Sequence, residues 1–109
     1  MTISQIQPQQ LRDWLQDPAR PQPTLLDVRE PWEVQICSLA ESLNIPMNHI
    51  ADQLANLNPE AETVVICHHG GRSMQVALFL ERSGFGKLHN LSGGVDAWAR
   101  QIDPAMSVY

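Results

Sequence analysis

The sequence predicts a three-layer α/β/α domain around a central parallel sheet of four or five strands. The chain has 109 residues, which suits one domain with a single hydrophobic core. Short apolar runs alternate with amphipathic segments, and strands that alternate with helices pair in parallel through right-handed crossovers. The strongest run, residues 64–66, is continuously apolar, as strands buried on both faces are. We therefore expect residues 1–109 to form a single domain.

The first half of the chain carries the signals of three helices and two strands. Leu11, Trp14 and Leu15 follow helical spacing, and the proline-rich residues 19–23 end that helix. Pro31 stands where the first turn of a short helix accepts proline. The expected elements are a helix within residues 8–18, a strand over 24–28, a short helix starting in 29–33, a strand over 42–47, and a helix that carries Ile50, Leu54 and Leu57 and stops at Pro59.

The second half predicts two strands and two helices. Residues 62–67 give the strongest strand signal, because β-branched side chains dominate them. A largely apolar helix follows over about residues 72–82, and Gly84 is expected at its C′ position. Residues 87–91 form a weaker fourth strand. Residues 93–102 carry apolar side chains at helical spacing, with Ser92 expected near the N-cap.

Composition excludes several classes of function. The net charge is −5 and no Lys/Arg cluster occurs, which argues against a nucleic-acid partner. No apolar run reaches the roughly 18 residues that a membrane span needs. The N-terminal residues lack the basic and apolar regions of a signal peptide. Only Cys37 and Cys67 could form a disulfide, so we expect a reducing, cytoplasmic location.

The stretch "VVICHHGGRS" carries the chemistry. Cys67 ends the buried strand, and ligands of parallel sheets bind at the carboxyl ends of strands. A thiol attacks as the thiolate, which nearby cations and helix N-termini favour. The glycines of the loop permit positive φ values, so the loop can turn backbone N–H groups toward the sulfur. We therefore expect the loop and the following helix to stabilise Cys67 as an anion, or a negative group carried on its sulfur.

The other loop residues have simpler interpretations. His68 and His69 are expected to line the pocket, where a protonated imidazole would favour an anionic donor. Adjacent residues rarely both point at one ion and no matching Cys/His cluster occurs, so we expect no metal site. Arg72 fits two readings equally, a functional cation and a solvated residue of the first helical turn. Cys37 has no such loop and is expected to be structural or incidental.

Cysteine-dependent phosphatases and arsenate reductases are the nearest competing interpretation. Phosphatases of this kind also close a thiolate loop with arginine, but with five intervening residues, C-x5-R. Here four residues separate Cys67 from Arg72, and Ile66 rather than histidine precedes the cysteine. The tighter loop suits a single sulfur atom better than a tetrahedral phosphoryl group, so we favour sulfur chemistry.

Three segments resemble the signatures of single-domain rhodaneses, sulfurtransferases that carry sulfane sulfur as a cysteine persulfide. These segments are "LLDVREPWEVQICSLAESLNIPM" at 25–47, "CHHGGRS" at 67–73 and "NLSGGVDAW" at 90–98. They occur in the family's order and cover almost the whole chain. One departure is visible: after "QIC" the family often has His and, three residues on, Gly, whereas this chain has Ser38 and Glu41.

The resemblance implies a double displacement without a cofactor. Cys67 would take the outer sulfur of a small anionic donor such as thiosulfate, and would pass it to cyanide or a protein thiol. It implies that Asp27 and Arg29 order the site with their charges. It also implies that backbone N–H groups of the loop surround the persulfide; the loop residues are His68, His69, Gly70, Gly71, Arg72 and Ser73. A persulfide carrier or regulatory module for a protein partner remains the alternative. An inactive binding module is disfavoured, because the cysteine is present.

Overall fold

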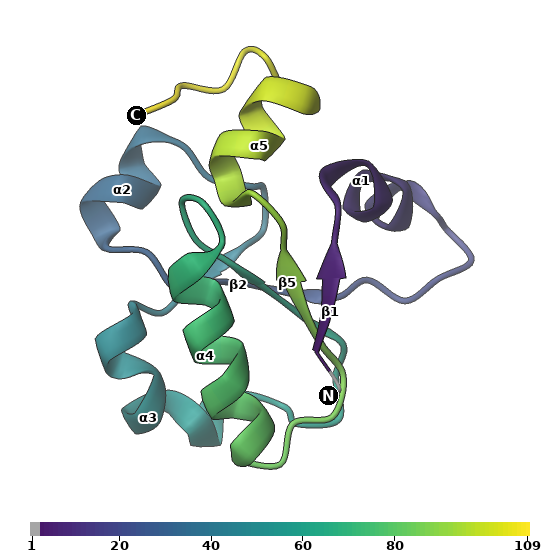
Figure 1. The fold of residues 1–109 in the computed structure, drawn as a ribbon. Helices are drawn as coiled ribbons and strands as arrows, with labels where there is room; N and C mark the ends of the chain where they lie inside the picture. Colours follow the sequence, from purple (N-terminus) through teal and green to yellow (C-terminus); the bar gives the residue numbers. More distant parts are fainter. Residues whose placement is uncertain (1–2) are drawn as a thin grey trace.

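The fold is described by a computed structural model over residues 3–109 (Figure 1). Its strands are β1 (Ile3–Ile6), β2 (Thr24–Asp27), β3 (Leu43–Asn44), β4 (Thr63–Ile66) and β5 (Leu88–Leu91). Its α-helices are α1 (Pro8–Gln16), α2 (Pro31–Ile36), α3 (Ile50–Gln53), α4 (Gly71–Arg82) and α5 (Gly94–Gln101). The 3-10 turns Met47–His49 and Leu54–Asn56 flank α3. No helix within residues 3–109 is both long enough and apolar enough to cross a membrane.

The five strands form one parallel sheet in the order β1-β5-β4-β2-β3, which confirms the predicted fold class. All four residues of the central β4 are buried, as its apolar sequence predicts. The edge strand β1 has no counterpart among the predicted elements. It pairs with β5 from Ile3 opposite Leu88 to Ile6 opposite Leu91, and only Ile6 of its four residues is buried. Its short polar sequence carries no strand signal of its own.

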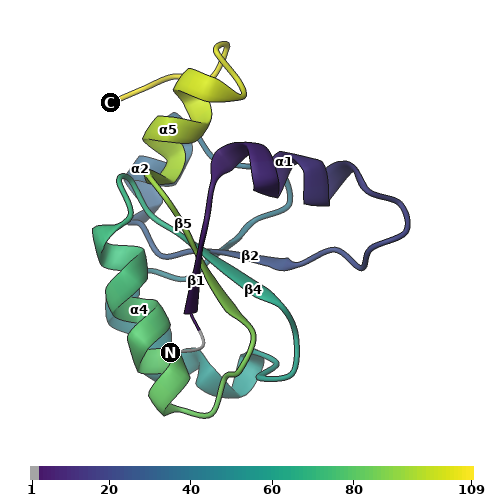
Figure 2. The same cartoon turned by 45° about the vertical axis from the view of Figure 1, so that its right-hand side comes forward.

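Helices cover both faces of the sheet and complete the three layers. Figure 2 shows α1 and α4 on opposite sides of the sheet. Val64 and Ile66 point into a core cluster shared with α1 and α5, whereas Val65 and Cys67 belong to a second cluster with α4. This alternation follows from the two-residue period of a strand. It places the Cys67 side chain on the α4 side of the sheet.

Two helix ends follow the predicted signals. Pro31 is the first residue of α2, as expected. Gly84 has φ +101° and stands directly after the C-cap of α4. There the Gly84 N–H donates to the Glu81 carbonyl and the Phe85 N–H donates to the Leu80 carbonyl, which is the Schellman arrangement. Local sequence therefore specifies both helix ends.

Three predicted elements differ in extent. The helix expected over 50–57 is α-helical only in α3, and the 3-10 turn Leu54–Asn56 continues it. The strand expected over 42–47 is reduced to β3, since it pairs with β2 at only two positions. The start of α5 is shifted slightly, because its N-cap is Gly93, with φ +75°, directly after Ser92.

The turn before β3 contains Glu41, one of the two departures from the rhodanese signature. Glu41 has φ +63°, the only positive φ among non-glycine residues of the described chain. The family often has glycine at this position, and glycine adopts such a backbone without steric cost. The turn is therefore kept in this chain with a residue that is strained there.

Candidate active site

Cys67 lies directly after β4 at the carboxyl edge of the sheet, with 1% of the residue exposed. The Gly70 N–H donates to its Sγ at 3.1 Å, and the thiol donates to Ser73 Oγ at 3.3 Å. Ser73 is buried in the first turn of α4 and donates to Oδ1 of Asn90 on β5. The sulfur is therefore held between the loop backbone and a hydroxyl that a neighbouring strand orients.

The two loop glycines differ in backbone conformation. Gly70 is the N-cap of α4 and has φ +109°, as expected for a loop that turns an N–H toward sulfur. Gly71 is the first residue of α4 and has no positive φ, and a Cβ built on it would meet nothing within 4 Å. Of the two loop glycines, Gly70 therefore takes the positive φ that the loop needs, and Gly71 does not.

The loop is fastened to the start of α5. The Val95 N–H donates to the Cys67 carbonyl at 2.9 Å, and the Asp96 N–H donates to the His68 carbonyl at 3.1 Å. Gly94 makes this approach possible: a Cβ there would lie 2.3 Å from the Cys67 carbonyl oxygen. The third signature segment therefore packs against the second.

Arg72 pairs with Glu33, a residue that the sequence reasoning did not single out. Its Nη1 and Nη2 lie 2.8 and 2.7 Å from the two carboxylate oxygens, and Glu33 is 4% exposed. This bidentate bond lowers the pKa of Glu33 to about 2 and raises that of Arg72. Glu33 also accepts the Glu30 N–H in a capping box, and the spacing of these two glutamates is the signal that could have found it.

Asp27 and Arg29 form a buried ion pair beside the site. Arg29 Nη2 lies 2.7 Å from Asp27 Oδ2, and neither residue is exposed. Arg29 Nη2 also donates to the Cys37 carbonyl at 2.7 Å. Arg29 therefore joins the end of β2 to the end of α2. Both cysteines are free and buried, and the Cys37 sulfur lies 3.8 Å from Arg29 Nη1.

Tyr109 reaches the site from the far end of the chain. Figure 1 shows the segment after α5 running back toward α2. The Tyr109 hydroxyl donates to Glu33 Oε1 at 2.8 Å and accepts from Arg29 Nη1 at 3.0 Å, so it bridges the two ion pairs. Its ring stacks on His68, with centroids 3.9 Å apart and planes 5° from parallel. No local pattern in the sequence points to this residue.

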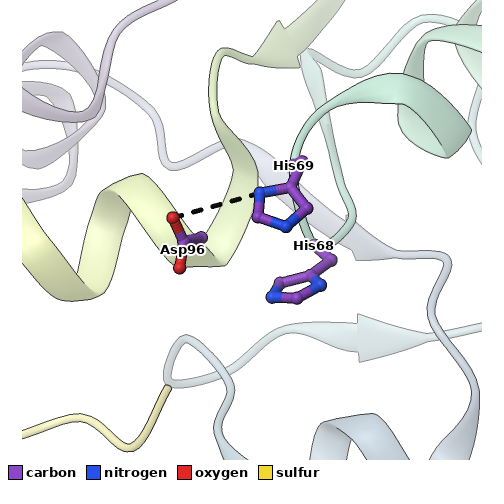
Figure 3. Close-up of side chains that lie close together, drawn as sticks. All are labelled: His68, His69 and Asp96. Atoms are coloured by element: carbon purple, nitrogen blue, oxygen red, sulfur yellow. Dashed lines mark ion pairs between the residues drawn. The ribbon is translucent and has the colours of Figure 1, made fainter. Parts of the chain in front are cut away.

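The rings of His68 and His69 lie side by side at the rim of the loop. Their ring centroids are 3.9 Å apart, and His69 Nδ1 lies 3.9 Å from Oδ2 of Asp96 on α5 (Figure 3). Burial and the neighbouring His69 lower the pKa of His68, and Asp96 opposes that shift. The two histidines and Asp96 form a cluster that the sequence reasoning did not assemble.

The sequence profile of the rhodanese-like domain family matches residues 7–101, which is most of the chain. The chain belongs to the rhodanese-like domain family. This confirms the resemblance drawn from the three signature segments. That residues 1–109 constitute one domain stays a prediction.

Similar proteins and solved structures agree with this family assignment. The rhodanese-like/PpiC domain-containing protein 12 of Arabidopsis thaliana is 38% identical over 98% of this chain, although the match spans only 38% of that protein. The thiosulfate sulfurtransferase GlpE of Pseudomonas aeruginosa is 30% identical over 95% of this chain and 90% of its own length. A rhodanese-like domain protein of Staphylococcus aureus is 26% identical, with a TM-score of 0.83 over 97% of this chain and 98% of its own. The chain therefore has sulfurtransferase relatives of its own size and others that are much longer.

Proposed function

We propose that this chain is a sulfurtransferase that carries sulfane sulfur on Cys67 as a persulfide. The observation that supports this most strongly is the setting of the Cys67 sulfur, which takes an N–H from Gly70 and lies beside a buried Ser73 hydroxyl. The Gly70 N–H donor favours negative charge on sulfur, which both the attacking thiolate and the persulfide carry. The sulfurtransferase relatives of similar length support the same reading.

The reaction with thiosulfate balances without a cofactor. The Cys67 thiolate attacks the outer sulfur and forms a Cys67 S–S bond, while the S–S bond of thiosulfate breaks and sulfite leaves with its electron pair. Cyanide then attacks the terminal sulfur, thiocyanate leaves, and the thiolate is restored. Arg72 is held by the buried Glu33 through a bidentate ion pair, so its role is to tie the first turn of α4 to α2. Asp27 and Arg29 act at a distance by fixing the end of β2.

A carrier for a protein partner is the second candidate. The much greater length of the Arabidopsis relative favours it, because a rhodanese-like segment there occupies only part of a longer protein. In that case a protein thiol accepts the terminal sulfur and thiosulfate turnover is incidental. Slow turnover with a high KM for thiosulfate would favour the carrier over the enzyme. A cytoplasmic location stays a prediction.

The loop length continues to favour sulfur over phosphate. Four residues separate Cys67 from Arg72. Both terminal nitrogens of Arg72 bind Glu33, so Arg72 does not point two free donors toward the loop. We expect turnover of thiosulfate and no significant turnover of an aryl phosphate at matched concentration. Comparable rates on the two substrates would overturn the choice of sulfur chemistry.

The test of the proposal compares the two cysteines. Thiosulfate:cyanide transfer should vanish in Cys67→Ala and persist in Cys37→Ala, with ping-pong kinetics. After incubation with thiosulfate and desalting, the intact mass should increase by one sulfur atom, and cyanide should remove the increase. Near-normal turnover in Cys67→Ala would refute the assignment, and a mass that never changes would favour an inert binding module.

A further inference from the structure

A cluster of three side chains stands at the rim of the Cys67 loop and has no part in the proposed sulfur transfer. His68 and His69 come from the loop after β4, and Asp96 comes from the first turn of α5 (Figure 3). Each offers one nitrogen or oxygen, and these three atoms all lie within 4.8 Å of one another. Imidazole and carboxylate are the ligands that zinc and neighbouring transition metals take up in proteins.

The two segments that carry the cluster are fixed to each other. The Val95 and Asp96 N–H groups donate to the Cys67 and His68 carbonyls. The His68 ring is further held by its stack on Tyr109. The backbone positions of the three side chains are therefore set by the fold, and little chain entropy remains to be lost when an ion gathers them.

Two of the three groups keep a ring nitrogen free for an ion, although His68 also has a hydrogen bond to the Tyr109 backbone. In the described residues 3–109, Nε2 of His68 is the only buried side-chain nitrogen or oxygen without a hydrogen bond, a condition that is rare and unfavourable. His69 Nδ1 and Asp96 Oδ2 are 3.9 Å apart, too far for a hydrogen bond but close enough for an ion to join them.

Asp96 has one competing partner, Arg100, whose Nε lies 3.1 Å from Oδ2. This is a solvent-exposed i,i+4 pair with an arginine that is 65% exposed, and such pairs are weak. The His69 side chain is 67% exposed and can rotate, so both groups can move the short distance that metal bonds of about 2.0–2.2 Å require.

We propose that His68, His69 and Asp96 bind one first-row divalent transition-metal ion, Zn²⁺ best among the common ones, at the rim of the Cys67 loop. Two nitrogens and one carboxylate leave a fourth tetrahedral position for water. This proposal departs from the expectation of no metal site, which rested on adjacent residues rarely both pointing at one ion and on the absence of a matching Cys/His cluster. The proposal is independent of sulfur transfer and holds whichever donor Cys67 uses.

The test measures Zn²⁺ binding by calorimetry in full-length Cys67→Ala protein, so that the reactive thiol cannot contribute. We expect one ion per chain, and a loss of affinity of about tenfold or more in His69→Ala and in Asp96→Asn. His49→Ala, which removes an exposed histidine outside the cluster, is the matched control and should bind Zn²⁺ with the affinity of the Cys67→Ala protein. Arg100→Ala frees Asp96 and should tighten binding about twofold.

A direct readout of ligation follows from the small number of histidines. The chain has four, so imidazole NMR signals of His68 and His69 should shift on addition of Zn²⁺, while those of His49 and His89 stay unchanged. Circular dichroism checks that each variant is folded. The proposal is overturned if His69→Ala and Asp96→Asn bind Zn²⁺ with the affinity of the Cys67→Ala protein, or if the signals of all four histidines shift alike.

Discussion

The ion pair between Glu33 and Arg72 should dominate the acid sensitivity of this protein. Glu33 is almost fully buried and accepts from Arg72 twice, from the Glu30 N–H and from the Tyr109 hydroxyl. Its pKa falls from 4.5 to about 2, chiefly through the bond to Arg72. Such a shift corresponds to about 3 kcal/mol of stabilisation at neutral pH. Because Arg72 is one-third exposed and partly screened, we expect about 2 kcal/mol.

The perturbation is Glu33→Gln, which keeps the shape of the side chain and removes its charge. A depressed carboxylate pKa stabilises the fold above the unfolded pKa, and that stabilisation is lost as pH falls toward the folded pKa. The cost of the substitution should therefore be about 2 kcal/mol and constant above pH 5 or so. It should fall to less than half of that value by about pH 3.

Urea unfolding of wild type and variant at pH 7, 5, 4 and 3 measures this difference. Glu60→Gln, at an exposed position, is the control and should change stability by less than about 0.5 kcal/mol at every pH. A Glu33→Gln cost that is the same at pH 3 as at pH 7 would show that shape, not charge, is what Glu33 contributes.

Four further substitutions test the backbone and the bridge from Tyr109. Glu41→Gly should stabilise the protein by about 0.5–1 kcal/mol, because it removes a side chain from a backbone with φ +63°; the melting temperature should rise by about 3–6 °C. Gly94→Ala should cost more than about 3 kcal/mol in urea unfolding, since its Cβ would lie 2.3 Å from the Cys67 carbonyl oxygen, whereas Gly71→Ala should stay within about 0.5 kcal/mol. Equal effects at the two glycines would contradict the packing described for the loop. Tyr109→Phe keeps the stack on His68 but removes bonds to Glu33 and Arg29, and should lower the free energy of unfolding by about 1–2 kcal/mol; no change would mean that water replaces the hydroxyl.

Much of the site could be predicted because its signals are local. The position of Cys67 at the end of a buried strand, the glycine at the N-cap of α4 and the stop at Gly84 are each readable within a few residues. The apolar sequence of β4 likewise indicates that both faces of this strand are buried. Where two glycines stood side by side, the sequence could not tell which of them takes the positive φ, because only the path of the chain into α4 decides it.

The sequence by itself determined the order of the elements after β1, the fold class and the candidate catalytic cysteine, because periodicity, turn chemistry and motif spacing act over short stretches of chain. Only the tertiary structure decided which residues meet one another around that cysteine. Arg72 meets Glu33 across 39 residues, Tyr109 meets Glu33 across 76, and β1 exists because it pairs with β5. His68, His69 and Asp96 meet because the loop after β4 docks on α5 through backbone hydrogen bonds. Such pairings depend on the parallel register of the sheet and on close approach at glycine, which no local pattern encodes.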